Sequence, residues 1–269
     1  MFYGIVLAAT LFIAGISCYF HQIRSYIDAY AISRAQQMFG SMPLAQEQEQ
    51  LIKSIAVQMG APDNIIMRRM NVSALRVFGY HNAFSYFPQV GGVLPISTIP
   101  FLFVSEGFFE DLTPEEQVFL IGHELAHIKE RHVLFLMPCA FLGLFILLFM
   151  LFIMHKRIKA VVYACVAERY QRRSFVGVMI LSIYLVSVAS GMFCLAYRRH
   201  IERDADYKAL EVLHSYDGCL KLLDRWQAEF KIPEHTTYFV GLMTDHPSCA
   251  ERRVYCLALQ NQYNQREIT

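Results

Sequence analysis

The sequence predicts an α+β fold that is mainly α-helical, with a small antiparallel β-sheet and three transmembrane helices. Three uncharged apolar runs, at residues 1–20, 133–154 and 175–197, are each long enough to span a bilayer. Residues 65–104 alternate short runs of Ile, Val, Phe and Tyr with Asn, Gly and Pro, a pattern typical of strands and turns. The net charge of +1 gives no basis for nucleic acid as a partner.

The N-terminal part is predicted to be a membrane anchor followed by the first part of a folded domain. Residues 1–20 lack a basic leader and a clear cleavage site, so we expect an anchor that is not cleaved. In residues 21–132, a helix is predicted at 44–59, because Gly60 is a typical C-terminal cap. Residues 99–104 are expected to form the last strand of the sheet.

A second helix has a marked N-terminus. Thr113 suits the N-cap, Pro114 the first helical position and Glu116 the third, which together make a capping box. The helix is expected to run to about Arg131. The motif His-Glu-Leu-Ala-His, at residues 123–127, would then lie in the middle of a helix, where the spacing of side chains is regular.

The two later apolar runs predict a transmembrane hairpin. Residues 133–154 and 175–197 are joined by a basic loop, residues 155–174, which contains six Lys or Arg residues and one Glu. A buried core helix of a soluble protein is the alternative for each run, but such long uncharged runs rarely occur outside membranes. Because a hairpin returns to the side it left, residues 198–269 are expected to complete the domain begun by residues 21–132.

Two helices are predicted in this last part. Residues 198–230 are expected to be helical up to a stop at Pro233, and residues 248–262 form a helix that begins with Pro247.

The motif at 123–127 predicts a metal site. His123 and His127 are four residues apart, which places both rings on one helix face, and two neutral imidazoles so placed can bind one Zn²⁺. Glu124 would lie beside the metal, where it can take a proton from the attacking water. The motif has only three fixed letters and occurs by chance in unrelated chains, so its context has to support it.

A catalytic zinc ion needs a third protein ligand. A third histidine six residues after the second one is excluded, because His132 is one residue short of that position. Glu130 is too close to His127 along the helix, and Glu168 lies in the hairpin loop. Glu202 is the remaining candidate, and Asp206, one turn later, could accept the second N–H of a zinc histidine. The alternative is that both carboxylates lie on a solvated, charged helix face.

The other histidines carry weaker expectations. His246 could donate a hydrogen bond to a developing oxyanion, and a plain helix-cap role is equally compatible with its position before Pro247. The remaining histidines lack partners in the sequence and are expected at the surface or at the membrane interface: His21, His81, His132, His155, His200, His214 and His235.

Taken together, these features resemble the HtpX-type integral-membrane zinc metallopeptidases, which are related to CAAX prenyl-protein proteases and to stress-activated metalloproteases of the mitochondrial inner membrane. The matching features are Asn82-Ala83-Phe84, Thr-Pro-Glu-Glu at 113–116, the motif at 123–127, the apolar hairpin, Glu-Arg-Asp-Ala-Asp at 202–206, and Asp-His-Pro at 245–247 with Glu251-Arg252. One departure is that a single apolar run, instead of two, precedes the protease domain.

The resemblance implies a zincin-like protease domain with one zinc ion. It implies His123, His127 and Glu202 as zinc ligands, Glu124 as general base, Asp206 as a supporting residue, His246 as a transition-state donor, and Asn82 in a strand near bound substrate. The expected function is that of a membrane-bound zinc metalloendopeptidase in protein quality control, with polypeptide substrates that include misfolded membrane proteins. A CAAX-type processing protease and a non-catalytic adaptor or assembly factor are the alternatives.

The expected location is the bacterial inner membrane, which the chain crosses several times. The resemblance and the unpaired cysteines favour a catalytic domain that faces the cytoplasm. The basic loop at 155–174 favours the opposite orientation, because short cytoplasmic loops are rich in Lys and Arg. The sequence gives no indication of the oligomeric state.

Overall fold

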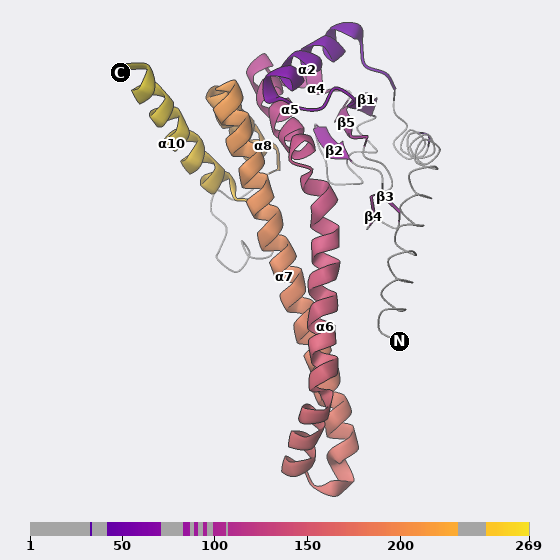
Figure 1. The fold of residues 1–269 in the computed structure, drawn as a ribbon. Coiled ribbons are helices and arrows are strands. Elements are labelled where there is room, and N and C mark those ends of the chain that lie inside the picture. Colours follow the sequence, from indigo (N-terminus) through magenta and orange to yellow (C-terminus); the bar gives the residue numbers. More distant parts are fainter. Residues whose placement is uncertain are drawn as a thin grey trace, which may run out of the picture. The chain divides into compact units, whose positions relative to one another are not determined.

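The structure is a computed structural model, and it describes residues 33, 42–70, 83–86, 89–90, 94–95, 99–105, 107–230 and 246–268. The chain divides into two compact units, residues 1–113 and 114–269. The first unit contains the sheet, and the second contains the His-Glu-Leu-Ala-His helix and the long hairpin (Figure 1).

The first described helix of the N-terminal unit is α2, Gln46–Met59. Its apolar face is buried through Ile52, Ile55 and Met59. Gly60 ends the helix with φ 62°, a left-handed conformation that glycine adopts without a steric penalty, and its N–H reaches the carbonyls of the last turn. This confirms the helix end predicted at Gly60.

The sheet is mixed, so the prediction of an antiparallel sheet is wrong for one of its two pairings. Its strands are β1 (Ile66–Met70), β5 (Phe101–Ser105) and β2 (Ala83–Tyr86), in that order. The central strand β5 is buried along its whole length; it pairs parallel with β1 and antiparallel with β2. Alternation of apolar residues locates strands but carries no information on their direction. The long connection from β1 to β5 is what permits a parallel pair.

Three further short elements lie among the described residues of the N-terminal unit. Strands β3 (Gln89–Val90) and β4 (Leu94–Pro95) form a separate antiparallel ribbon. Helix α4 (Phe108–Asp111) follows β5 and buries Phe108.

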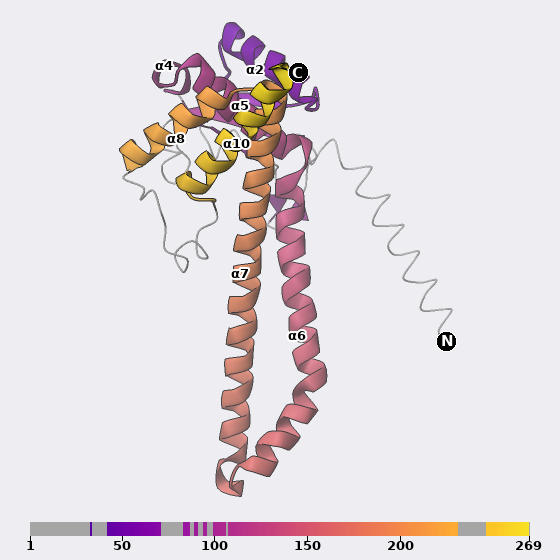
Figure 2. The same ribbon diagram turned by 90° about the vertical axis from the view of Figure 1, so that its left-hand side faces the viewer.

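The C-terminal unit is helical. Figures 1 and 2 show α6 and α7 running side by side as an antiparallel hairpin. Helix α5 packs on α7 and α8 within this unit. The elements that the structure describes in this unit are α5 (Pro114–Lys129), α6 (His132–Cys165), η1 (Glu168–Tyr170), α7 (Gln171–Leu213), α8 (Tyr216–Phe230) and α10 (Cys249–Ile268).

Close packing of α5 on α8 depends on one glycine and one partly buried ion pair. Gly218 of α8 lies directly against the backbone carbonyl of Glu115, where a side chain would collide. The next residue, Glu116, is buried and accepts hydrogen bonds from Nε and Nη2 of Arg225 at 2.9 and 3.0 Å. These contacts tie the N-terminal turn of α5 to α8.

Several helix boundaries differ from the predictions; for example, α10 extends to Ile268, whereas an end at residue 262 was predicted. The helix predicted at 198–230 is broken at His214, which has φ 51°, so that α8 starts a new direction. Helix α5 stops before Arg131, which has φ 55°, and α6 begins one residue later. Helix α10 starts after Ser248 instead of at Pro247, because Ser248 and Glu251 exchange hydrogen bonds in a capping box.

Of the expected membrane spans, one is supported among the described residues. The helical segment Glu168–Leu213 is long and apolar enough to cross a membrane. The run at 133–154 lies within α6, many of whose side chains fall outside the described set, and residues 1–20 lie outside the described residues. Those two spans stay predictions.

Candidate metal centre

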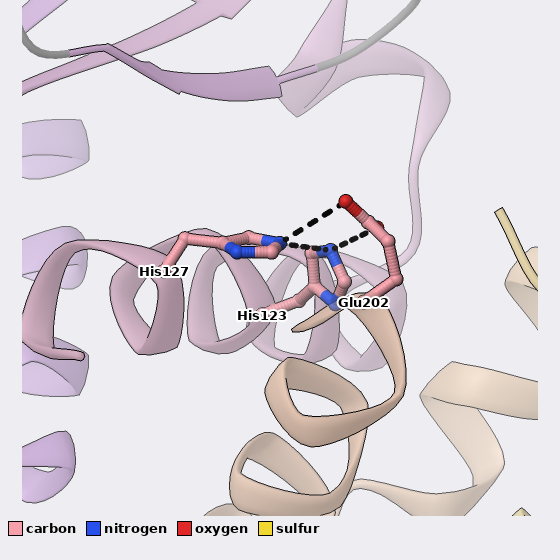
Figure 3. Close-up of side chains that lie close together, drawn as sticks. All are labelled: His123, His127 and Glu202. Carbon is pink, nitrogen blue, oxygen red and sulfur yellow. Dashed lines mark hydrogen bonds and ion pairs between the residues drawn. The ribbon is translucent and has the colours of Figure 1, made fainter. Parts of the chain in front are cut away.

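Three side chains from two helices converge in the C-terminal unit (Figure 3). His123 and His127 lie one turn apart on α5, and their Nε2 atoms are 3.1 Å apart. Glu202, on α7, directs Oε2 to within 3.4 Å of Nε2 of His123 and Oε1 to within 3.6 Å of Nε2 of His127. The i, i+4 spacing on one helix and a single carboxylate on the next helix therefore suffice to build a three-point cluster.

The chemistry of this cluster fits a zinc ion. The candidate ligand atoms of His123, His127 and Glu202 all lie within 4.8 Å of one another. Two imidazoles and one carboxylate are a donor set of catalytic zinc sites, which keep one further position open. Both Nδ1 atoms face other partners, so the Nε2 atoms are the ones turned toward the centre.

Asp206 holds the first histidine. Its Oδ1 lies 2.8 Å from Nδ1 of His123, and the carboxylate is fully buried. Arg252 of α10 donates to it from Nε at 2.8 Å and from Nη2 at 2.6 Å, and the Tyr255 hydroxyl donates to Oδ2. Sequence reasoning assigned no role to Arg252 or Tyr255. Their spacing of three residues on one helix was the available signal, and it is not specific without the fold.

These contacts set the charge of the site. Burial opposes ionisation of Asp206, but the Arg252 guanidinium and the hydrogen bond from His123 lower its pKa to about 2. Burial also opposes protonation of His123, but hydrogen bonds to Asp206 and Glu202 raise its pKa to about 10 when no metal is bound. Against its own burial, Glu202 has a pKa well below its usual value because His123, His127 and His246 surround it. Two ionised carboxylates thus face the imidazoles.

The second histidine is held differently, and this corrects one expectation. His132, expected to lie at the surface without a partner, places Nδ1 3.1 Å from Nδ1 of His127. Its Nε2 lies 3.3 Å from Oδ2 of Asp204. Lys208 contacts Asp204 at 2.9 Å and Glu130 at 2.8 Å. Burial, followed by the charge of His127, lowers the pKa of His132 to about 4. The prediction missed these contacts because they join residues from three helices.

The other predicted site residues occupy different positions. Glu124 is buried on α5 directly after His123. His246 places Nδ1 3.0 Å from Oε2 of Glu202, and its side chain is 52% exposed. Asn82 lies outside the described residues. The roles of all three stay predictions. The burial of Asp206 and Glu202, whose side chains are 0% and 13% exposed, excludes the alternative of a solvated charged face.

Two comparisons with known proteins gave a match. The sequence model of Peptidase family M48 matches residues 43–255, which is more than half of the chain. The crystal structure of Ste24p from S. mikatae is similar in fold, with a TM-score of 0.57 and 15% sequence identity. The similarity covers 88% of this chain and 58% of that one, so this chain spans little more than half the length of Ste24p. No curated protein matches the sequence.

Proposed function

We propose that this chain, which belongs to peptidase family M48, is a membrane-bound zinc endopeptidase. The observation that carries the proposal is the convergence of His123, His127 and Glu202 within 4.8 Å of one another. Family membership supports a protease, and the donor set supports zinc as its metal. When bound here, zinc would supply the Lewis acidity that polarises a peptide carbonyl and makes water nucleophilic near neutral pH.

Glu124 is proposed as the general base. It follows His123 on the same helix, so its carboxylate belongs to the segment that supplies two of the metal ligands. In this role it takes a proton from the attacking water and later delivers it to the leaving amine. A non-catalytic adaptor would need neither this carboxylate nor a complete set of ligands, which is why we favour an enzyme.

His246 is proposed to assist at the exposed side of the site. The His246 side chain is 52% exposed, whereas His123 and His127, which also contact Glu202, are buried. An imidazolium held through Nδ1 by Glu202 can donate its second N–H to the oxyanion that develops on the substrate. Replacement of His246 by Ala would then lower kcat more than it raises KM.

The proposed substrates are unfolded segments of membrane proteins. Strand β2, which follows Asn82 directly in the sequence, lies at the edge of its sheet among the described strands. An extended polypeptide can add to such an edge through main-chain hydrogen bonds. Recognition of main chain suits protein quality control, where sequences vary. CAAX-type processing is the alternative, and we favour it less because enzymes of that type use more membrane spans than the three proposed for this chain.

The proposed topology has three spans, at residues 1–20, 133–154 and 175–197, in a bacterial inner membrane with the catalytic domain in the cytoplasm. This topology can be tested by labelling a natural cysteine, because Cys165 is exposed near the tip of the hairpin. With the active site in the cytoplasm, Cys165 would react with an impermeant maleimide added to intact cells, whereas the C165A control would not. Labelling only after cell lysis would place the active site outside the cytoplasm.

The enzymatic proposal is tested with Glu124→Gln. We expect this variant to retain zinc, measured by elemental analysis of the purified chain in detergent. Its cleavage of an unfolded polypeptide should fall by about 10²–10⁴-fold, the usual contribution of a general base. His123→Ala should lose both zinc and activity. Full activity of the Gln variant would rule out the mechanism, and absence of zinc from the wild type would rule out the metal site.

A further inference from the structure

We infer that His132 and Asp204 form a relay that holds His127 in the tautomer able to bind a metal through Nε2. His127 is then positioned through a second imidazole, whereas His123 is positioned by a carboxylate directly. This inference rests on the proposed zinc site and extends it to residues that the motif does not include.

His123 and His127 differ in the group that their Nδ1 atoms contact. Each ring turns Nε2 toward the centre of the site and Nδ1 away from it. Nδ1 of His123 meets Asp206 at 2.8 Å, whereas Nδ1 of His127 meets Nδ1 of His132 at 3.1 Å. Nε2 of His132 then meets Asp204 at 3.3 Å. The carboxylate beside His127 is therefore one ring further out.

The proton positions follow from these contacts. A neutral imidazole carries one N–H, and a ligand nitrogen must offer a lone pair. When Nε2 of His127 faces the metal, its proton is on Nδ1, so Nδ1 of His132 has to accept. The single proton of His132 is then on Nε2, where Asp204 accepts it. The Asp204 carboxylate, as the final acceptor, thus sets which group donates and which accepts in both contacts of the relay.

The backbone is shaped to allow this contact. Residues five apart on one continuous helix point about 140° apart around the axis, so His132 could not face His127 from a continued α5. Arg131, with φ 55°, interrupts the helix immediately before His132 and turns the chain back. A left-handed conformation is unfavourable for a residue other than glycine, so the surrounding contacts must hold it.

The outer end of the relay is also anchored. Lys208 lies one turn after Asp204 on α7 and contacts it at 2.9 Å. The same ammonium contacts Glu130, just after the end of α5, at 2.8 Å. Asp204 is therefore held in place by a residue that also links the two helices supplying the metal ligands.

The test compares two amide replacements of His132. Asparagine places its amide oxygen near the position of Nδ1 and can still accept from His127. Glutamine, although closer to histidine in size, places its amide near the position of Nε2. We expect His132→Gln to weaken zinc binding about 10–100-fold, the usual effect of losing an outer hydrogen-bond partner, and His132→Asn to weaken it much less. A role in packing alone predicts the reverse order, since Gln fills the space better.

Zinc affinity is measured by chelator competition on the purified full-length chain, without reference to activity. The exposed residue His200 supplies the matched controls, His200→Asn and His200→Gln, both expected to bind zinc as the wild type does. Equal zinc affinities of the two His132 variants, or tighter zinc binding by His132→Gln, would overturn the relay. The proposed zinc site would stand in that case, provided that Glu124→Gln still binds zinc. A wild type without zinc would overturn the relay and the proposed function together.

A substitution of Asp204 tests the relay even if the His132 variants fail to fold. Asp204→Ala leaves both rings in place and removes the terminal acceptor, while Lys208 can keep its contact with Glu130. We expect it to lose zinc to the chelator several-fold faster than the wild type, because His132 is no longer held in one tautomer. An unchanged rate of zinc loss would overturn the relay.

Discussion

The Asp206 carboxylate lies 2.8 Å from Nδ1 of His123, and this contact turns the opposite nitrogen of the ring toward Glu202. The same carboxylate is paired with Arg252, so the helix α10 shares in orienting a residue of α5. Because Asp206 is so deeply buried, we expect it to affect both the zinc affinity and the free energy of unfolding. These two effects can be measured separately.

Asp206→Asn should lower both zinc affinity and stability. The amide cannot accept from every donor around it, and it leaves the Arg252 charge buried without its partner. We expect about 10–100-fold weaker zinc binding and a loss of about 3–5 kcal/mol in unfolding free energy. Chelator competition and urea unfolding of the purified chain check these values.

The matched control for Asp206→Asn is Asp224→Asn, which removes a solvent-exposed carboxylate paired with Arg253. It should change stability by less than about 1 kcal/mol. Similar effects of the two substitutions would contradict the importance given to the buried pair.

Acid should destabilise the metal-free chain through Asp206. Its pKa is lowered from 3.8 to about 2, so its contribution is present above pH 3.8 and is lost as the pH falls toward 2. The shift corresponds to roughly 2 kcal/mol. Urea unfolding of the wild type and of Asp206→Asn at several pH values gives the free energy of unfolding as a function of pH. The contribution of Asp206 is the difference between the slopes of these two pH dependences. Parallel slopes would show that Asp206 titrates normally.

Zinc binding near pH 7 should release about one proton from His123. With a pKa of about 10 in the metal-free chain, this imidazole is protonated at pH 7 and must become neutral to bind a metal. Apparent zinc affinity should therefore increase about tenfold per pH unit between pH 7 and 10. Calorimetry in buffers of different ionisation enthalpy counts the protons, and a count of zero would contradict the raised pKa.

Arg131→Gly should stabilise the chain or leave it unchanged, although it removes a side chain at a helix junction. Arg131 is exposed and has φ 55°, a conformation that costs about 1 kcal/mol for a residue with a Cβ atom. The gain is partly offset by the larger entropy of glycine in the unfolded state. Arg131→Val should destabilise by more than 1 kcal/mol. Thermal unfolding compares them, and a less stable Gly variant would indicate that the guanidinium is needed.

Gly218→Ala should destabilise the contact between α8 and α5. A Cβ atom there would collide with the backbone carbonyl of Glu115, which cannot move aside as a flexible side chain can. We expect a loss of about 1–3 kcal/mol, larger than the gain in helix propensity. Gly191→Ala, in open space on α7, is the control and should be neutral or stabilising. A stable Gly218→Ala variant would show that α8 can shift.

Local patterns and membrane topology predicted part of this arrangement well. Gly60 ends α2 as its residue type suggests, and the spacing of His123 and His127 led directly to two rings on one face. Glu202 was reached by asking which carboxylate returns to the same side of the membrane. These are properties of short segments or of their order, and a sequence displays them.

Contacts between distant segments could not be predicted in the same way. Parallel pairing of β1 with β5 is decided by the path of the connection, which apolar alternation does not describe. Arg131 and His214 adopt left-handed conformations although neither residue type signals them. The partner of His127 depends on such a turn, so His132 looked isolated until the turn was known.

Helix α7 runs unbroken from Gln171 to Leu213, a length of roughly 65 Å at 1.5 Å per residue. The apolar part that would lie among lipid chains and the turn that bears Glu202 therefore belong to one stiff rod. A rotation or axial slide imposed by a thicker or thinner bilayer would be passed mechanically to the carboxylate, with no joint between them to absorb it. A change in lipid composition would then reach the candidate metal centre through this helix.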